Sequence, residues 1–121
     1  MIYTSYFGAI EQLPKDYALI SIARSAPKYW FGLEYKKLAP SLAILSDYKR
    51  TGNEEKYIQE FSFQLFCLTP SIVIDELVTM ARGYNIILMC YEKPQDFCHR
   101  HLVAKWLTDN GYKTQEFNYG N

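Results

Sequence analysis

Long hydrophobic runs are the first feature that this sequence lacks. No apolar run approaches the roughly 20 residues that a membrane helix needs, so we expect no membrane contact. The first 17 residues also lack the basic start and the long apolar stretch of a signal peptide. Together these absences predict a cytoplasmic protein.

An excess of charge is also missing, because 13 Lys and Arg residues are balanced by 13 Asp and Glu residues. Proteins that hold long duplex DNA through many phosphates usually carry a basic excess. Any contact with nucleic acid is therefore expected to be local. The chain has 121 residues, 49% of them hydrophobic, which suits one compact domain over residues 1–121 with a substantial core.

Cysteine is scarce, and its three copies cannot all pair within one chain. In a reducing cytosol we expect free thiols, metal ligands or core residues rather than disulfides. A CxxC pair is absent, which excludes a thioredoxin-like redox motif. Cys90, Cys98 and His99 are suitable zinc ligands by type, but adjacent residues such as Cys98 and His99 rarely hold one ion well, and no paired CxxC or HxxxH is present.

Hydrophobic patterning predicts strands that alternate with helices. Residues 84–92 are almost continuously apolar, which indicates a strand buried on both faces, as in a parallel sheet. Asn53, Thr69 and Asp96 are expected to cap helices. Residues 25–40 are expected to form a loop with a short helical turn near 33–37. Strands are predicted at 1–7, 17–24, 84–92 and 112–119, and helices at 41–50, 53–68, 69–83 and 96–111.

Strands separated by helices imply right-handed crossovers. The expected fold class is therefore α/β, a single domain with a small, mostly parallel sheet flanked by helices. In such a sheet, ligands bind beyond the carboxyl ends of the strands. The first three predicted strands end at that edge in polar residues, namely Ser5 and Tyr6, then Arg24 and Ser25, then Cys90, Tyr91 and Glu92.

The last helix is expected to begin at the same edge with Cys98, His99 and Arg100. Its spacing places His99 on the packing side, pointing toward the strand ends, and His101 on the solvated face. The alternative for His99 is a buried, hydrogen-bonded imidazole without a function.

Free backbone amides at this helix start, with Arg24 and Arg100, would form an anion site. The alternative is that both arginines pair with Glu92 or Asp96 and hold the loop in place. Lys28 and Lys93 are expected on the surface.

A cysteine in the first turn of a helix near arginines has a lowered pKa, which makes Cys98 a candidate nucleophile with His99 or Glu92 as its proton acceptor. Cys90 is also consistent with a small packing residue, and Cys67 is expected in the core. A cysteine phosphatase is excluded because the loop between Cys90 and Arg100 contains no glycine for a tight amide cradle.

Three segments of the chain, IYTSYF, ISIARSAPKYWFG and IILMCYEKPQDFCHRHLVAKWL, resemble the bacterial family catalogued as domain of unknown function 488. Its hallmark is a strand ending in Cys-Tyr-Glu, followed by Cys-His-Arg at the start of a helix, which match 90–92 and 98–100. The resemblance implies an α/β fold and a shared site, without a particular reaction. The family's association with DNA repair implies a nucleotide or nucleic-acid ligand.

The family typically places Asp-Val-Arg at the end of its second strand, where this chain has Ile22, Ala23 and Arg24. The arginine is retained and the acidic residue is not. If that acid serves in relatives, its role here is either lost or taken by Glu92.

The sequence therefore predicts a cleft that binds an anionic, nucleotide-like or phosphorylated small molecule, with Cys- and His-dependent chemistry. Alternatives are a non-catalytic module that binds a ligand or a protein, and a zinc-stabilised structural module. No resident cofactor or metal is expected, and the sequence does not indicate the oligomeric state. The predicted catalytic residues are Cys98, His99 and Glu92. The predicted ligand contacts are Arg24, Arg100, Ser25, Tyr6, Tyr91 and Cys90, with Trp30 as a further residue for stacking.

Overall fold

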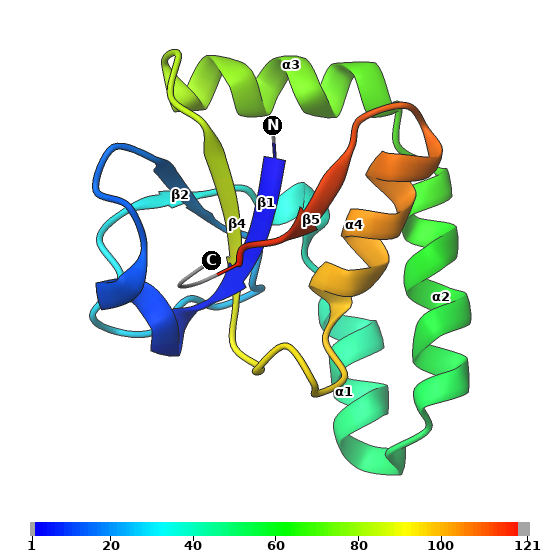
Figure 1. The fold of residues 1–121 in the computed structure, drawn as a ribbon. Coiled ribbons are helices and arrows are strands. Elements are labelled where there is room, and N and C mark those ends of the chain that lie inside the picture. The colour runs from blue at the N-terminus through cyan, green and yellow to red at the C-terminus, as the bar shows by residue number, and fades with distance from the viewer. Residues whose placement is uncertain (1, 119–121) are drawn as a thin grey trace.

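The computed structural model describes residues 2–118, so Met1 and Tyr119, which fall in the first and last predicted strands, lie outside the described residues. Within this range five parallel strands form one sheet in the order β3-β2-β4-β1-β5 (Figure 1). The prediction of an α/β fold with a small parallel sheet is confirmed. The strands are β1 Ile2–Tyr6, β2 Ala18–Ser21, β3 Leu33–Glu34, β4 Ile86–Cys90 and β5 Thr114–Glu116.

Strand β4 is the centre of the sheet, paired with β1 on one side and β2 on the other. All five of its residues are buried, as its continuous apolar sequence predicts. Ile86 and Leu88 pack into the larger core cluster on one face, and Ile87 and Met89 pack into a second cluster on the other. Cys90 continues the Ile86–Leu88 side and therefore ends the strand facing the larger core.

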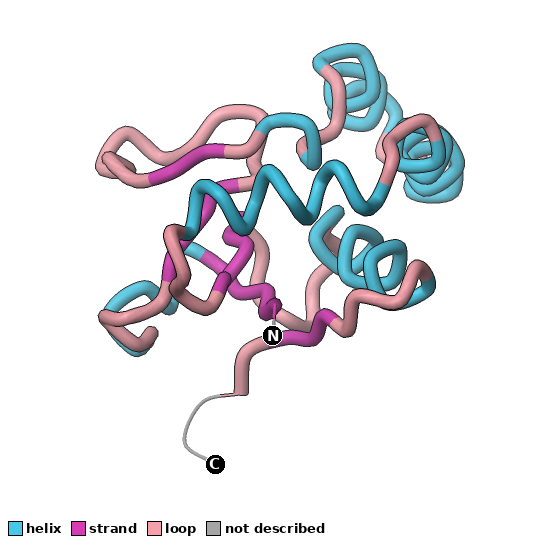
Figure 2. The backbone as a smooth tube through the Cα atoms, turned by 90° about the horizontal axis from the view of Figure 1, so that it is seen from above, coloured by secondary structure: helices cyan, strands magenta, loops and turns pink. Residues whose placement is uncertain are grey.

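The larger core lies between the sheet and its helices, all on one face, while the short 3-10 helix η1 and the connection after β2 cover the other face (Figure 2). Val73 and Leu77 of α3, Phe61 of α2 and Val103 of α4 meet the strands in this core. Burial of these side chains is the main stabilising term of the fold. The helices are η1 Phe7–Gln12, η2 Lys36–Leu38, α1 Leu42–Thr51, α2 Glu54–Phe66, α3 Pro70–Ala81 and α4 His99–Asp109.

Capping by side chains explains where α1 and α2 begin. The Ser41 hydroxyl accepts a hydrogen bond from the backbone N–H of Ile44 (3.2 Å), and the Asn53 side chain accepts one from Lys56 (3.1 Å). Between them Gly52 adopts the left-handed conformation (φ 68°) that ends α1. Asn53 thus caps α2 as predicted, and Pro70 opens α3 as its first residue.

The prediction that Asp96 caps the last helix is wrong, because α4 begins three residues later with Cys98 as its N-cap. Asp96 instead closes a turn, donating its backbone N–H to the carbonyl of Lys93 (3.0 Å). The backbone of Cys98 is extended (φ −153°, ψ 142°). This conformation turns the Cys98 side chain back toward the end of β4.

The segment 25–40, predicted to be a loop with one helical turn, also contains strand β3. Leu33 and Glu34 pair with Ile20 and Ser21 of β2, although both are exposed. Such a short edge strand has no pattern of alternating hydrophobic residues in the sequence. It is recognised only by its pairing with β2. The helical turn itself exists as η2, displaced by a few residues from the predicted place.

Within the described residues, no single helix combines the length and apolar composition that a membrane crossing needs. Helices α2 and α3 meet these requirements only as a pair, and they are bent by 83° at their junction.

Arg82 ends α3 in the left-handed conformation (φ 50°, ψ 42°), which is unfavourable for a residue with a Cβ atom. We expect Arg82→Gly to raise the free energy of unfolding by roughly 0.5 to 1 kcal/mol, since relief of the left-handed strain exceeds the entropy gained by the unfolded chain. Urea unfolding measures this change. Arg82→Ala, which keeps the Cβ atom, should give no increase, and a loss of stability in Arg82→Gly would contradict the interpretation.

Candidate functional site

The carboxyl ends of β2 and β4 form a topological switch point. The chain leaves β2 toward β3 at one edge of the sheet, and it leaves β4 toward β5 at the opposite edge. The first connection crosses the η1 face, and the second, which contains α4, crosses the helical face. Connections that diverge in this way leave a crevice between the two strand ends, where α/β sheets bind ligands.

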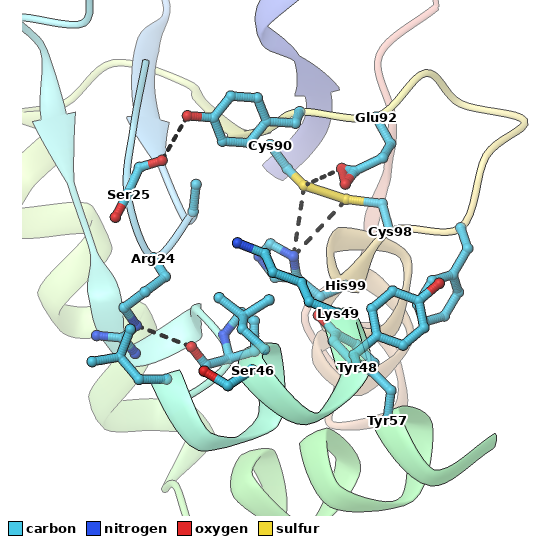
Figure 3. Close-up of a pocket in the computed structure, with 16 residues that line it drawn as sticks. Arg24, Ser25, Ser46, Tyr48, Lys49, Tyr57, Cys90, Glu92, Cys98 and His99 are labelled. Atoms are coloured by element: carbon cyan, nitrogen blue, oxygen red, sulfur yellow. Dashed lines mark hydrogen bonds between the residues drawn. A yellow bond between two sulfur atoms is a disulfide. The ribbon is translucent and has the colours of Figure 1, made fainter. Parts of the chain in front are cut away.

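A cavity of about 570 Å³ lies at this crevice (Figure 3). Its walls come from the ends of β2 and β4, from one side of α1, from α2 and from the start of α4. Most of the predicted site residues meet here, including Arg24 and His99, which are 75 positions apart in sequence numbering. The residues that line the cavity are Ala23, Arg24, Ser25, Pro40, Leu42, Leu45, Ser46, Tyr48, Lys49, Tyr57, Cys90, Tyr91, Glu92, Phe97, Cys98 and His99.

His99 forms the inner end of the cavity and is only 7% exposed. Its Nε2 lies 2.7 Å from the backbone carbonyl oxygen of Ile22. A carbonyl only accepts hydrogen bonds, so Nε2 carries the proton and Nδ1 holds a lone pair. Burial lowers the pKa of His99 to about 4, with smaller contributions from nearby charges such as Arg100. The imidazole is therefore neutral at physiological pH.

Cys90 and Cys98 are joined by a disulfide, which corrects the expectation of free thiols. Cys90 ends β4 facing the helical side, and the extended backbone of Cys98 brings the second sulfur to it. Cys98 therefore has no thiolate in this state, and it can act as the predicted nucleophile only after the disulfide is reduced. The expectation for Cys67 is also wrong, since this free cysteine follows α2 at an exposed position.

The disulfide faces hydrogen-bond acceptors on two sides. His99 Nδ1 lies 3.6 Å from Cys90 Sγ and 3.9 Å from Cys98 Sγ. A carboxylate oxygen of Glu92 lies 3.4 Å from Cys90 Sγ. A disulfide sulfur carries no hydrogen, so these contacts become hydrogen bonds only when the cysteines are reduced to thiols.

Arg100 does not line the cavity, contrary to the expectation that it would lie there with Arg24. Its side chain is fully buried and forms a two-pronged ion pair with Glu116 of β5, at 3.1 and 3.0 Å. It also donates to the backbone carbonyl of Glu92 (2.5 Å). Arg100 therefore joins the start of α4 to the edge strand and to the loop after β4. This role resembles the predicted alternative, with Glu116 as the acid rather than Glu92 or Asp96.

Three further predicted positions differ from expectation. Tyr6 does not line the cavity, and its ring instead lies against the Arg100 guanidinium, 5.9 Å from ring centre to Cζ. Trp30 lies outside the cavity as well, donating its indole N–H to the carbonyl of Leu33 (3.0 Å) and packing on Phe7. His101 is partly buried rather than solvated. The positions of Tyr6 and Trp30 are set by these contacts with distant or loop residues, which local sequence does not indicate.

Arg24 and Tyr91 build the side walls. Arg24 donates to the backbone carbonyls of Lys36, Ala39 and Pro40, at 3.0 to 3.3 Å, which fixes the segment before α1 against the end of β2. The Tyr91 hydroxyl donates to the carbonyl of Ser25 (2.6 Å) and so joins the ends of β4 and β2. Burial is the main cause that raises the pKa of Tyr91.

The cavity residues contributed by α1 and α2 are missing from the sequence prediction. Lys49 reaches into the cavity from α1 (Figure 3) and has no acidic partner within residues 2–118. Tyr57 of α2 packs edge-on against Tyr48 and Phe97, at 5.1 Å between ring centres. Burial raises the pKa of Tyr57, and Glu92 raises it further. In the sequence these residues read as an ordinary exposed lysine and an aromatic packing stripe, and only tertiary contact places them at the cavity.

Comparison with known proteins identifies the family. A family model described as the active DUF488-N3 subclade, DUF488-N3a, matches residues 9–111. The chain belongs to this family. The match covers the cavity and both halves of the Cys-Tyr-Glu and Cys-His-Arg motif, so the resemblance inferred from the sequence is confirmed. Searches of curated proteins and of solved structures gave no match.

The buried imidazole of this DUF488-N3a chain predicts that acid destabilises the fold. The pKa of His99 is about 4 in the folded protein and 6.5 as the ordinary value, so between these values the unfolded chain binds more protons. We expect the free energy of unfolding in urea to fall by about 3 kcal/mol from pH 6.5 to pH 4. His99→Gln should remove most of this dependence, whereas His101→Gln should keep it. The same pH dependence in wild type and His99→Gln would contradict the assignment.

The ion pair of Arg100 predicts a large stability loss when the arginine is replaced. Arg100→Met should lower the free energy of unfolding by about 3 kcal/mol, because carbonyl and carboxylate acceptors lose their buried donor. The matched control is Lys105→Met, which removes an exposed pair with Asp109 on the same helix and should cost less than about 1 kcal/mol. Thermal and urea unfolding of both variants measure the difference, and equal losses would show that Arg100 does not hold α4.

Proposed function

We propose that the cavity between β2 and β4 binds a small anionic ligand that carries a phosphate and a planar ring, as a nucleotide does. The observation that carries this proposal is Lys49, a cation that reaches into the cavity without an acidic partner within residues 2–118. Among the described residues that line the cavity, Arg24 adds a second positive charge, and Glu92 supplies the only carboxylate. An anion entering the cavity therefore meets a positive field in a partly desolvated space, where charge interactions are strong.

The size and the aromatic lining favour a ligand with a ring. A volume of about 570 Å³ is typical of sites for small molecules and cofactors. Tyr48, Tyr57 and Phe97 form a connected aromatic wall, and Tyr91 borders the cavity from the β4 side. Such surfaces stack on any planar ring, so they favour a nucleobase without selecting one.

The family description names an active subclade, which supports a chemical role for this site. His99 is neutral at physiological pH, and its Nδ1 lone pair faces the sulfurs of Cys90 and Cys98, so it would accept a proton from one of these thiols in the reduced protein. Glu92 is the second candidate for proton transfer. Nucleophilic attack by Cys98 requires prior reduction of the disulfide, so we assign any thiol chemistry to the reduced protein only.

A non-catalytic ligand-binding module is the second candidate function. The disulfide favours it, because a sulfur bonded to sulfur offers no nucleophile to a bound ligand. The two candidates share the same ligand and the same cavity. They differ in whether the bound ligand is converted to a product. Incubation of the ligand with oxidised and with reduced protein, followed by measurement of product, distinguishes them.

The binding proposal predicts that removal of Lys49 weakens phosphorylated ligands specifically. Thermal-shift measurements with nucleoside monophosphates, sugar phosphates and inorganic phosphate identify a ligand, and calorimetry then gives its affinity. Lys49→Ala should weaken binding at least tenfold, since it removes the unpaired cation. Lys113→Ala, an exposed lysine outside the cavity, should bind like wild type. The proposal fails if no phosphorylated compound shifts the melting temperature of wild type, or if both variants lose affinity equally.

A further inference from the structure

Cys90, Cys98 and His99 form a cluster whose ligand atoms all lie within 4.8 Å of one another, and all three residues are buried. We propose that the reduced protein binds one Zn²⁺ through Cys90 Sγ, Cys98 Sγ and His99 Nδ1. This site does not depend on the proposed binding of anions, since it uses neither Lys49 nor Arg24.

The orientation of His99 is the first argument. Metal-bound histidines almost always donate their other ring N–H to a carboxylate, a carbonyl or a water molecule. Here Nε2 is held by the carbonyl of Ile22 at 2.7 Å, which leaves the lone pair of Nδ1 directed at both sulfurs. In the disulfide form this lone pair, on a side chain more than nine-tenths buried, faces no hydrogen-bond donor among residues 2–118, because its neighbours there are the two sulfurs of the disulfide. A bound cation gives that nitrogen its missing partner.

The separations between the sulfur and nitrogen ligand atoms are the second argument. Zinc bonds of 2.3 Å to sulfur and about 2.0 Å to nitrogen, in tetrahedral arrangement, place a ligating sulfur and nitrogen about 3.5 Å apart. The observed separations of His99 Nδ1 from the sulfurs of Cys90 and Cys98 are 3.6 and 3.9 Å. The Cα atoms of the two cysteines lie 7.5 Å apart, which leaves room for their sulfurs to separate to the roughly 3.8 Å of two zinc ligands.

The backbone at the start of α4 allows the adjacent residues Cys98 and His99 to bind the same ion, which neighbouring residues rarely do. Cys98 is extended and His99 is the first helical residue. The change of backbone conformation between them brings both side chains to the same side, toward Cys90. Because all three residues line the cavity, a fourth position remains for a water molecule, as in catalytic rather than closed structural zinc sites.

Metal binding requires prior reduction of the Cys90–Cys98 disulfide, and a thiol can serve as the reductant. Two thiol molecules reduce the Cys90–Cys98 bond, each giving one electron and one proton, and are themselves joined as a disulfide. Zn²⁺ then displaces the protons of the two cysteine thiols, so two protons are released for each ion bound. A small-molecule disulfide reverses these steps: it takes two electrons from the two cysteine thiolates and two protons from solvent to become two thiols, the Cys90–Cys98 bond forms again, and the ion is released.

The test uses the full chain, reduced and stripped of metal, then titrated with Zn²⁺ and separately with Co²⁺. Wild type and Cys67→Ser should bind one equivalent, and Co²⁺ should give the thiolate charge-transfer band and intense visible bands of a tetrahedral site. The oxidised protein should bind none at this site. Cys90→Ser and Cys98→Ser should each weaken Zn²⁺ binding at least a hundredfold, and His99→Ala at least tenfold.

A labelling experiment on wild type keeps the test valid if a cysteine variant fails to fold. In reduced protein, Zn²⁺ should protect Cys90 and Cys98 from iodoacetamide while leaving Cys67 reactive, as peptide mass spectrometry measures. Absence of stoichiometric binding in folded, reduced wild type would overturn the proposal. Unchanged binding in the folded Cys90→Ser or Cys98→Ser variant would overturn it as well.

Discussion

The hydrogen bond between His99 Nε2 and the carbonyl of Ile22 is the interaction on which the site depends. It joins the first residue of α4 to the residue that follows β2, although the two are far apart in the chain. Phe61 of α2 meets the imidazole edge-on at 5.5 Å and completes its surroundings. This contact decides which nitrogen holds the proton, and it directs the other nitrogen at the pair formed by Cys90 and Cys98. The chemistry available at the cavity end follows from that orientation.

Arg24 and Arg100 hold the walls of the cavity in place through contacts with other parts of the chain. Arg100 fastens the start of α4 to β5 through Glu116, and Arg24 fastens the chain before α1 through backbone carbonyls. The planar guanidinium group of each has several N–H donors in a fixed arrangement, which suits it to hold several acceptors at once. The cation without an acidic partner among residues 2–118 is Lys49, which lies outside the Cys-Tyr-Glu and Cys-His-Arg segments. The arginines that hold the cavity walls and the cation without an acidic partner therefore come from different parts of the chain.

Much of the fold follows from local sequence, and much of the site does not. The continuous apolar run of β4 and the caps at Ser41 and Asn53 are local signals, and the elements they indicate are present. The meeting of Arg24 with His99 follows from parallel strands that share one edge. The disulfide depends on the extended backbone of Cys98, and the aromatic wall depends on how α2 packs. Neither of these features has a periodic pattern in sequence, so only three-dimensional contact reveals them.

The tautomer of His99 is the most direct test of this account. Long-range correlation of imidazole carbon-bound protons with the ring nitrogens distinguishes a protonated from an unprotonated nitrogen, and His101→Gln assigns the signals. In metal-free, oxidised protein at neutral pH, we expect a neutral ring with the proton on Nε2, and this proton should exchange slowly because it is hydrogen-bonded to the Ile22 carbonyl. A proton on Nδ1, or a charged ring, would contradict the arrangement that places a lone pair against the two sulfurs.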